Sequence, residues 1–228
     1  KLFDKLKAQG ITIFLQDGSA VQQTSPDAII YSSAIEDDNP DFIAAKDTPR
    51  FHRSIAMANT VNRSGMQQIA IAGSCGKTSV TGWMTSALQA LGKNPVMING
   101  GYTNEFIDDK FPGNFKAGED IVIYEADESD GSLVNFKPDC AVLLNLGIDH
   151  HEKSKLEEFF DEFLNNSQTI TISDKLTYLI PAGREANTFS EDVTSGETAD
   201  FKVDSISHTP EGTSFSCQNN EVNTRQFG

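Results

Sequence analysis

The segment from Gln68 to Gly92 constrains the fold of this chain more than any other part of the sequence. A short apolar run, residues 69–72, precedes a glycine-rich polar loop, residues 73–77. Gly92 can adopt the left-handed conformation that ends a helix. Between the loop and Gly92, apolar side chains recur at the spacing of one helical face, namely Val80, Trp83, Met84, Ala87, Leu88 and Leu91. The order of strand, loop and helix predicts an α/β fold.

The loop has the residue types that bind phosphate. Glycines allow the backbone to turn so that successive N–H groups converge, and the positive end of the following helix adds to their field. Lys77 is a compact cation for the β- and γ-phosphates of a nucleotide, and the Thr78 hydroxyl is a ligand for Mg²⁺. We therefore predict an ATP-binding loop formed by Gly73, Ser74, Cys75, Gly76, Lys77, Thr78 and Ser79.

Two features of this loop leave alternatives open. The general phosphate loop has a glycine five residues before its Gly-Lys pair, where this chain has Ile71. The alternative to phosphate binding is a glycine-rich turn with a solvated lysine. Cys75 lies near a helix N-terminus, which can acidify a thiol. The interpretation that we favour for Cys75 is a side chain that packs in the loop or lines the site without chemistry of its own.

Other apolar patterns predict the rest of a central domain. Residues 95–98, 121–124 and 140–144 have the composition of buried strands. After about residue 168, alternating segments such as 201–203 and 213–217 predict short strands, which we expect to be antiparallel. Ser154 and Glu157 have the spacing of a capping box, and helically spaced apolar residues follow, namely Leu156, Phe159, Phe160, Phe163 and Leu164. The domain is thus predicted to have a mostly parallel sheet and an additional short antiparallel β region.

Residues 1–62 predict a small Rossmann-like α/β unit that precedes this domain. Its first helix is expected to include Leu2, Phe3 and Leu6 and to end at Gly10. Further along, we expect a buried strand at 11–15, a second strand at 28–31, a turn or helix start at Pro40 and a short helix at 55–61. The polar residues 62–65 are the candidate linker to the second domain, residues 66–228.

Acidic and histidine motifs follow two of the predicted strands. Ligands gather at the carboxyl edge of an α/β sheet, so residues 125–130, which include Glu128, are candidates for metal binding beside the loop. The alternative is a solvated acidic loop. His150 could ligate a metal with Asp149 orienting its ring. We assign no role to His52 or His208.

Composition excludes several classes of protein. The net charge of −15 argues against a general nucleic-acid binder, which needs a positive field. No apolar run is long enough to predict a membrane span. Three cysteines, an odd number without a CxxC pair, argue against a disulfide framework and favour a reducing cytoplasm. Because the chain starts at Lys1 without a methionine, we expect it to be part of a longer protein.

The ordered motifs resemble the Mur ligase family of peptidoglycan amino-acid ligases. The sequence has GSCGKTS at 73–79, then Asn99-Gly100-Gly101, then EADESDGS at 125–132, then IDHH at 148–151. The resemblance implies a three-domain enzyme that is considerably longer than this chain. Residues 1–62 would be part of its UDP-sugar-binding N-terminal domain, and residues 66–228 would be its central ATP-binding domain, incomplete at the C-terminus.

The resemblance also implies roles for individual residues. Lys77 would contact the β- and γ-phosphates, and Thr78 and Glu128 would hold the Mg²⁺ that bridges them. Glu128 and His150 would hold a second Mg²⁺ near the acceptor carboxylate, so that Lys77, Glu128 and His150 form the catalytic set. Asn99 would contact substrate near the γ-phosphate. Two serines, Ser32 and Ser33, would lie near the uridine end of the substrate.

The implied activity is ATP-dependent ligation of L-alanine to the carboxylate of UDP-N-acetylmuramate through an acyl phosphate. Cys75 stands where the alanine-adding members usually have histidine, and Gly147 stands where they usually have an acidic residue. These departures leave the attached amine open, and a related ligase that attaches a tripeptide is one alternative. A kinase or ATPase is a second, although a guanine-specifying NKxD motif is absent. A non-catalytic nucleotide-binding module is a third, and the oligomeric state stays open.

Overall fold

The computed structural model describes residues 2–129, 131–147, 153–190 and 199–224. Its main feature is a ten-stranded sheet with the order β12-β11-β10-β9-β8-β7-β3-β6-β4-β5. The phosphate-loop strand β3 (Gln67–Ala72) lies between β6 (Ile121–Glu125) and β7 (Cys140–Leu143), and both pairings are parallel. The prediction of an α/β fold with a mostly parallel sheet is therefore confirmed.

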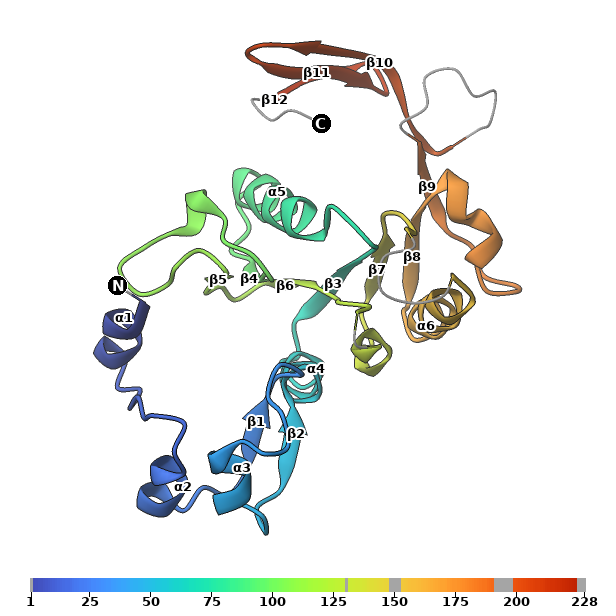
Figure 1. Cartoon of the computed structure of the whole chain (residues 1–228). Helices are drawn as coiled ribbons and strands as arrows, with labels where there is room; N and C mark the ends of the chain where they lie inside the picture. The colour runs from blue at the N-terminus through green and yellow to red at the C-terminus, as the bar shows by residue number, and fades with distance from the viewer. Residues whose placement is uncertain (1, 130, 148–152, 191–198, 225–228) are drawn as a thin grey trace.

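The remaining strands extend this sheet on both sides. On one side lie β4 (Val96–Ile98), parallel to β6, and the antiparallel edge strand β5 (Phe115–Lys116). On the other side, β8 (Thr169–Ser173), β9 (Asn187–Ser190) and β10 (Phe201–Thr209) follow in parallel pairings. Antiparallel strands β11 (Gly212–Cys217) and β12 (Asn220–Thr224) complete the sheet and project away from the helices (Figure 1).

The region after residue 168 was only partly predicted. Antiparallel pairing is correct between β10 and β11 and between β11 and β12, but Phe201 and Lys202 at the start of β10 pair in parallel with β9. The antiparallel prediction is wrong for β8 and β9, which are parallel members of the central sheet. The alternating pattern of Thr169–Ser173 is typical of a strand, but it carries no information about the direction of the neighbouring strand.

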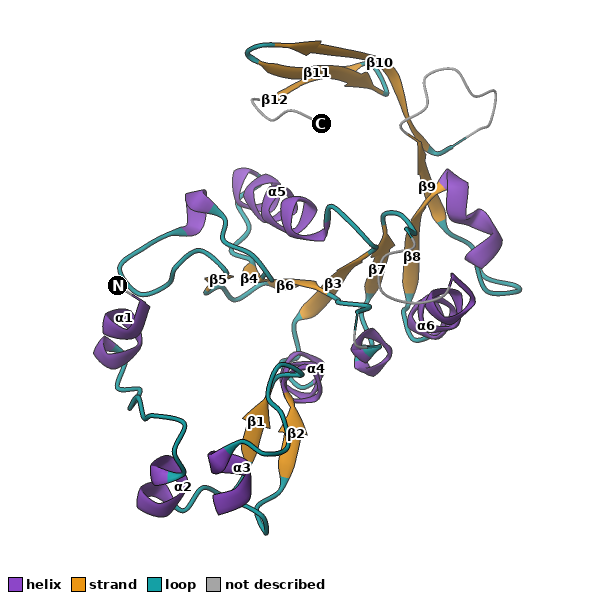
Figure 2. Ribbon diagram, in the orientation of Figure 1, coloured by secondary structure: helices purple, strands orange, loops and turns teal. Residues whose placement is uncertain are grey.

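Helices cover both faces of the sheet (Figure 2). On one face, Val80, Met84 and Leu88 of α5 (Lys77–Ala90) pack against a cluster that includes Ile71 and Ile123. On the other, α4 (Arg53–Asn62) and α6 (Lys153–Asn165) join a larger cluster that contains Ala58 and Phe160 as well as residues of β3, β6 and β7. Successive strand residues point to opposite faces, which explains why residues 69–72, 121–124 and 140–143 are apolar at consecutive positions.

Two details of these helices differ from the predictions. Trp83 and Leu91 were assigned to the packed face of α5, but they are 48% and 76% exposed. Ser154 is not a capping residue, because Lys153 before it is already helical. The predicted apolar face of α6 is confirmed, since Leu156, Phe160, Phe163 and Leu164 are buried and Phe159 is partly buried.

The N-terminal unit is built on a separate parallel pair, β1 (Ile29–Tyr31) and β2 (Arg50–His52). Near this pair lie α2 (Ser19–Thr24) and α3 (Pro40–Ala44), the latter capped by the Asn39 side chain. The first helix, α1 (Leu2–Ala8), lies apart from the pair, and Lys5 Nζ donates to the Phe111 carbonyl (Figure 1). The predicted strand at 11–15 is wrong: the small sheet contains β1 and β2 only, and Leu15 is 77% exposed.

Three short 3₁₀ helices complete the described elements: η1 (Asn104–Phe106), η2 (Ser132–Asn135) and η3 (Asp174–Leu179). Within the described ranges, no helix has both the length and the apolar character needed to cross a membrane.

Candidate functional site

The glycine loop connects β3 to α5 at the carboxyl edge of the sheet. Gly73 has a φ of 136°, and Gly76, which caps the helix, has a φ of 83°. A Cβ atom on Gly73 would lie 3.1 Å from the backbone nitrogen of Asn145. Both positions therefore need glycine, because the backbone is left-handed there and, at Gly73, closely approaches the segment after β7.

The first turn of α5 leaves donors for a ligand. The first helical hydrogen bond runs from Val80 N–H to the Gly76 carbonyl, and Gly76 offers no side-chain cap. The N–H groups of Lys77, Thr78 and Ser79 precede that bond and lie at the positive end of the helix. This arrangement fits a phosphate group.

Asn145 holds the loop in place from the end of β7. Its Oδ1 accepts from Cys75 N–H at 2.9 Å, and its Nδ2 donates to the Cys75 carbonyl at 3.0 Å. Ser74 is bonded to the same segment, because its Oγ accepts from Gly147 N–H at 2.8 Å. Sequence reasoning assigned no role to Asn145. The only sequence feature that could have indicated a role for Asn145 is its position, as a polar residue directly after a predicted buried strand.

Lys77 is paired with Glu128 inside the site. Its Nζ lies 2.8 Å from Glu128 Oε2 and 2.7 Å from the Gly73 carbonyl oxygen. The two side chains are only 11% and 7% exposed. The structure thus brings together two of the predicted catalytic residues, and the Lys77 cation lies over the loop in contact with a carboxylate.

Thr78 contacts a different carboxylate of the site, that of Glu125. Its hydroxyl donates to Glu125 Oε2 at 3.0 Å, and the same oxygen accepts from Gly100 N–H at 2.8 Å. Asn99 lies beneath this group, 6% exposed, and its Nδ2 donates to the Thr78 carbonyl at 3.0 Å. Asn99 Oδ1 is buried without a hydrogen-bond partner among the described residues. In this structure Asn99 supports Thr78 from behind.

The remaining residues that were predicted for the site are not among those described at the glycine loop. Ser32 and Ser33 follow β1 in the N-terminal unit, where Ser32 Oγ accepts from the Ala34 N–H. His150 and Asp149 lie outside the described residues, so the predicted histidine ligand stays a prediction. In the described ranges no cluster of three or more His, Cys, Asp or Glu side chains is arranged to hold a metal.

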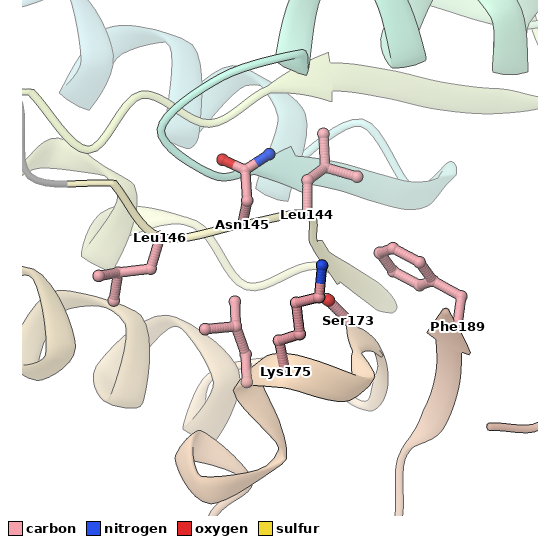
Figure 3. A pocket seen from close by; sticks show the side chains of 7 residues that line it. Leu144, Asn145, Leu146, Ser173, Lys175 and Phe189 are labelled. Carbon is pink, nitrogen blue, oxygen red and sulfur yellow. The ribbon is translucent and has the colours of Figure 1, made fainter. Parts of the chain in front are cut away.

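A hollow of about 240 Å³ lies beside the loop at the ends of β7, β8 and β9. Its lining is mainly apolar, with polar groups from Asn145, Ser173 and Lys175 (Figure 3). Figure 3 shows the Asn145 amide directed toward the glycine loop, which agrees with its bonds to Cys75. The sheet edge that carries the candidate phosphate site thus also has room for a small organic group.

Comparison with known proteins identifies the family. Residues 71–228 match the family model described as the Mur ligase middle domain. The chain belongs to the Mur ligase family. That match includes the glycine loop, Glu125, Glu128 and Asn145.

Relatives within the family share much of this chain. A UDP-N-acetylmuramate–L-alanine ligase of Cyanothece sp. is 33% identical over 226 residues, covering 92% of this chain and 45% of that protein. The enzyme of the same name from Streptomyces griseus is 38% identical over 167 residues, covering 70% of this chain and 34% of that protein. The chain thus spans less than half the length of these curated relatives.

Solved structures of Mur ligases have the same fold. A UDP-N-acetylmuramate–alanine ligase from Thermotoga maritima is 24% identical with a TM-score of 0.81, and the match covers 99% of this chain and 52% of that one. A Neisseria ligase for L-alanyl-γ-D-glutamyl-meso-diaminopimelate is 17% identical with a TM-score of 0.78, and the match covers 99% and 76%. Ligases named for different amines therefore share this fold.

Proposed function

We propose that this chain is the nucleotide-binding part of an ATP-dependent ligase that joins L-alanine to the carboxylate of UDP-N-acetylmuramate. The observation that carries the proposal is the Lys77–Glu128 pair over the glycine loop, beside the open N–H groups of the first turn of α5. A nearly buried lysine over a helix N-terminus is suited to polyphosphate binding. The choice of UDP-N-acetylmuramate as acceptor and L-alanine as amine is supported by the names of the related ligases.

The residues at the loop also fit a divalent cation. Thr78, Glu128 and Glu125 present oxygen atoms, which are the ligands that Mg²⁺ prefers. We assign Thr78 and Glu128 to a Mg²⁺ bound with the nucleotide, and Glu128 and His150 to a second Mg²⁺. When bound, Mg²⁺ supplies positive charge that offsets the charge of the phosphates.

In this proposal Lys77 exchanges partners when nucleotide binds. Its ammonium group leaves Glu128 for the β- and γ-phosphate oxygens, and the Glu128 carboxylate becomes available for the cation. The loop N–H groups hold the phosphates, while Asn145 keeps the loop backbone in its bound shape. We also assign Asn99 to the γ-phosphate end of the site.

The ligation proceeds in two transfers. The substrate carboxylate oxygen attacks the γ-phosphorus of ATP, ADP leaves, and an acyl phosphate results. The amine nitrogen of L-alanine then attacks the acyl carbon, phosphate leaves, and a proton is lost from nitrogen. The protein positions the reactants and stabilises phosphoryl charge, and neither transfer needs a protein nucleophile.

The N-terminal unit is assigned to the sugar nucleotide. We propose that residues 1–62 are part of the UDP-binding domain, with Ser32 and Ser33 near the uridine. We also propose that the protein is cytoplasmic, because its three free cysteines are consistent with a reducing compartment.

The test is ADP formation by the protein in its full natural length, with ATP, Mg²⁺ and UDP-N-acetylmuramate. We expect turnover with L-alanine and none without an amine, and a loss of about 100-fold or more in Lys77→Ala. Lys155→Ala, at an exposed ion pair of α6, is the matched control. Residues 1–228 alone are expected to bind ATP weakly without turnover.

Other outcomes would change the assignment. Turnover only with a cell-wall tripeptide would keep the site and replace the amine. ADP release without any amine would favour a kinase or ATPase. A Lys77→Ala variant within a few-fold of wild type would remove the proposed role of the loop.

A further inference from the structure

The segment that connects β4 to β5, residues 99–114, forms an arm that begins at the candidate site. Three backbone pairings join its two halves, namely Asn99–Asn114, Thr103–Gly113 and Ile107–Pro112. The two halves therefore run antiparallel, and a turn at 108–111 closes the arm at its tip. The arm thus connects the surroundings of the glycine loop to a turn that lies outside the central sheet.

The base of the arm lies along one stripe of α5. Contacts with the arm recur at every fourth residue of this helix, namely Thr78, Gly82 and Ser86. Asn99 Nδ2 donates to the Thr78 carbonyl at 3.0 Å, and Glu105 Oε2 accepts from the Ser86 hydroxyl at 2.8 Å. Between these bonds, a Cβ atom on Gly82 would lie 3.2 Å from the Thr103 methyl group. Residues four apart share one helical face, so the arm and the first turns of α5 form one packed unit.

The tip of the arm is held by α1 of the N-terminal unit. Within the turn, Asp108 Oδ1 accepts from the N–H groups of Lys110 and Phe111 at 2.7 and 2.6 Å. The carbonyls of the same turn bind α1. Lys5 Nζ donates to the carbonyls of Asp108 and Phe111, the latter at 3.1 Å, and Gln9 Nε2 donates to the Lys110 carbonyl at 2.9 Å. One ammonium group and one amide thus bind three carbonyls of a single turn.

The N-terminal unit therefore meets the rest of the chain at two separate places (Figure 1). At the first, β2 runs directly into α4, whose Ala58 and Val61 belong to the larger core cluster of the central sheet. At the second, α1 binds the tip of the arm. A body attached at one place can still rotate about it, whereas a second contact limits that rotation. The bonds at the tip thus help to decide how the N-terminal unit is oriented toward the base of the arm.

We infer that Lys5 and Gln9 are positioning residues, which orient the N-terminal unit toward the phosphate loop by holding the tip of the arm. The inference rests on the proposed function, because the N-terminal unit would carry the sugar nucleotide whose carboxylate must meet the γ-phosphate. A displacement of about 1 Å between reacting groups can lower a rate by about 100-fold. The contact leaves the chemistry of the phosphate loop unchanged and affects only the alignment of the two substrates.

Three variants of the α1 segment separate these bonds from other properties of the helix. Lys5→Met/Gln9→Ala removes both donors and introduces residues that favour a helix. Lys5→Arg keeps a cationic donor at the same place. Lys7→Met is the matched control, because Lys7 belongs to the same helix and its side chain makes no bond to the turn among the described residues. Equal urea midpoints would show that each variant folds as the wild type does.

The experiment follows hydrogen exchange of the arm, residues 99–114, in the protein of full natural length. On the same samples, kcat and KM are measured for ADP formation with ATP, Mg²⁺, UDP-N-acetylmuramate and L-alanine. We expect the arm amides of Lys5→Met/Gln9→Ala to exchange about 10-fold faster. Its kcat should fall by about 10-fold with an unchanged KM for ATP, because the phosphate loop itself is intact. Lys5→Arg and Lys7→Met are expected to behave like the wild type.

The outcomes distinguish the two proposals. Arm exchange at the wild-type rate in Lys5→Met/Gln9→Ala would show that α1 does not hold the arm, and would overturn the inference whatever the activity. Faster exchange with an unchanged kcat would overturn the positioning role. An equal fall of kcat in Lys7→Met would also overturn it, since the charge of the helix would then be the cause. Wild-type protein without turnover would overturn the proposed function, and the exchange rates would still decide whether α1 holds the arm.

Discussion

The Lys77–Glu128 pair should be a measurable source of stability in the absence of nucleotide. Its side chains are 11% and 7% exposed, so removal of one partner leaves the other largely desolvated. Breaking a buried pair in this way costs roughly 3–5 kcal/mol. We expect the lower end for Lys77→Met, about 3 kcal/mol, because the pair lies at the sheet edge where water can approach Glu128. For a domain of this size that is a fall in Tm of roughly 6–12 °C.

The assay is urea unfolding of residues 1–228 followed by circular dichroism, for wild type, both single variants and the double variant. Glu128→Gln should cost less than Lys77→Met, because a glutamine oxygen can still accept from Lys77. The double variant Lys77→Met/Glu128→Gln should be more stable than Lys77→Met alone, since no unpaired charge remains. Lys155→Met, which breaks a pair with 53% and 67% exposed side chains, should change stability by less than about 0.5 kcal/mol. Additive single effects, or a Lys77→Met protein as stable as wild type, would refute the reasoning.

Two further predictions concern the packing that surrounds the site. Gly131 has a φ of 69°, and an added Cβ would lie 2.7 Å from Phe159, so Gly131→Ala should lower the unfolding free energy by about 1–3 kcal/mol. Gly183 has a φ of 79° and no atoms close to an added Cβ, so Gly183→Ala should be destabilised only by its strained backbone. Equal urea midpoints for the two variants would argue against a clash at Gly131. Burial, with a smaller effect of the Asp139 charge, raises the pKa of Tyr124 above its ordinary value of 10.0. As the pH rises, the unfolded chain therefore releases the Tyr124 proton before the folded chain does, and the unfolding free energy should fall above about pH 10. In unfolding measurements across this pH range, Tyr124→Phe should show a smaller fall. An equal fall in the variant and the wild type would contradict the prediction.

The core of the fold was predictable because its signals are local. A strand of six residues, a glycine loop and an amphipathic helix are specified by neighbours in the sequence, and the structure places them at β3, residues 73–76 and α5. The features that could not be predicted depend on neighbouring strands. Residues 11–15 are apolar enough for a strand, but no neighbouring strand is available in the two-stranded sheet. Short strands were predicted after about residue 168, but the parallel direction of Thr169–Ser173 is decided by its neighbours β7 and β9.

The candidate site shows the same difference between local and distant sequence signals. Lys77 and Thr78 were predicted as site residues because they belong to a short motif, whereas the contacts of Asn145 and Glu125 with this segment depend on strands that are distant in sequence. Consecutive loop residues, Lys77 and Thr78, are each held by a different glutamate of the motif at 125–132, and the loop backbone is held by Asn145.

These contacts orient the loop N–H groups, the Lys77 ammonium group and the Thr78 hydroxyl at the carboxyl edge of the sheet. A loop that is oriented in advance loses less conformational entropy when nucleotide binds. If Lys77 binds phosphate as proposed, the Lys77–Glu128 ion pair must first break, and this is the energetic cost of nucleotide binding. Nucleotide and divalent cation should therefore bind with positive coupling, because the phosphate that takes Lys77 also frees Glu128 for the metal.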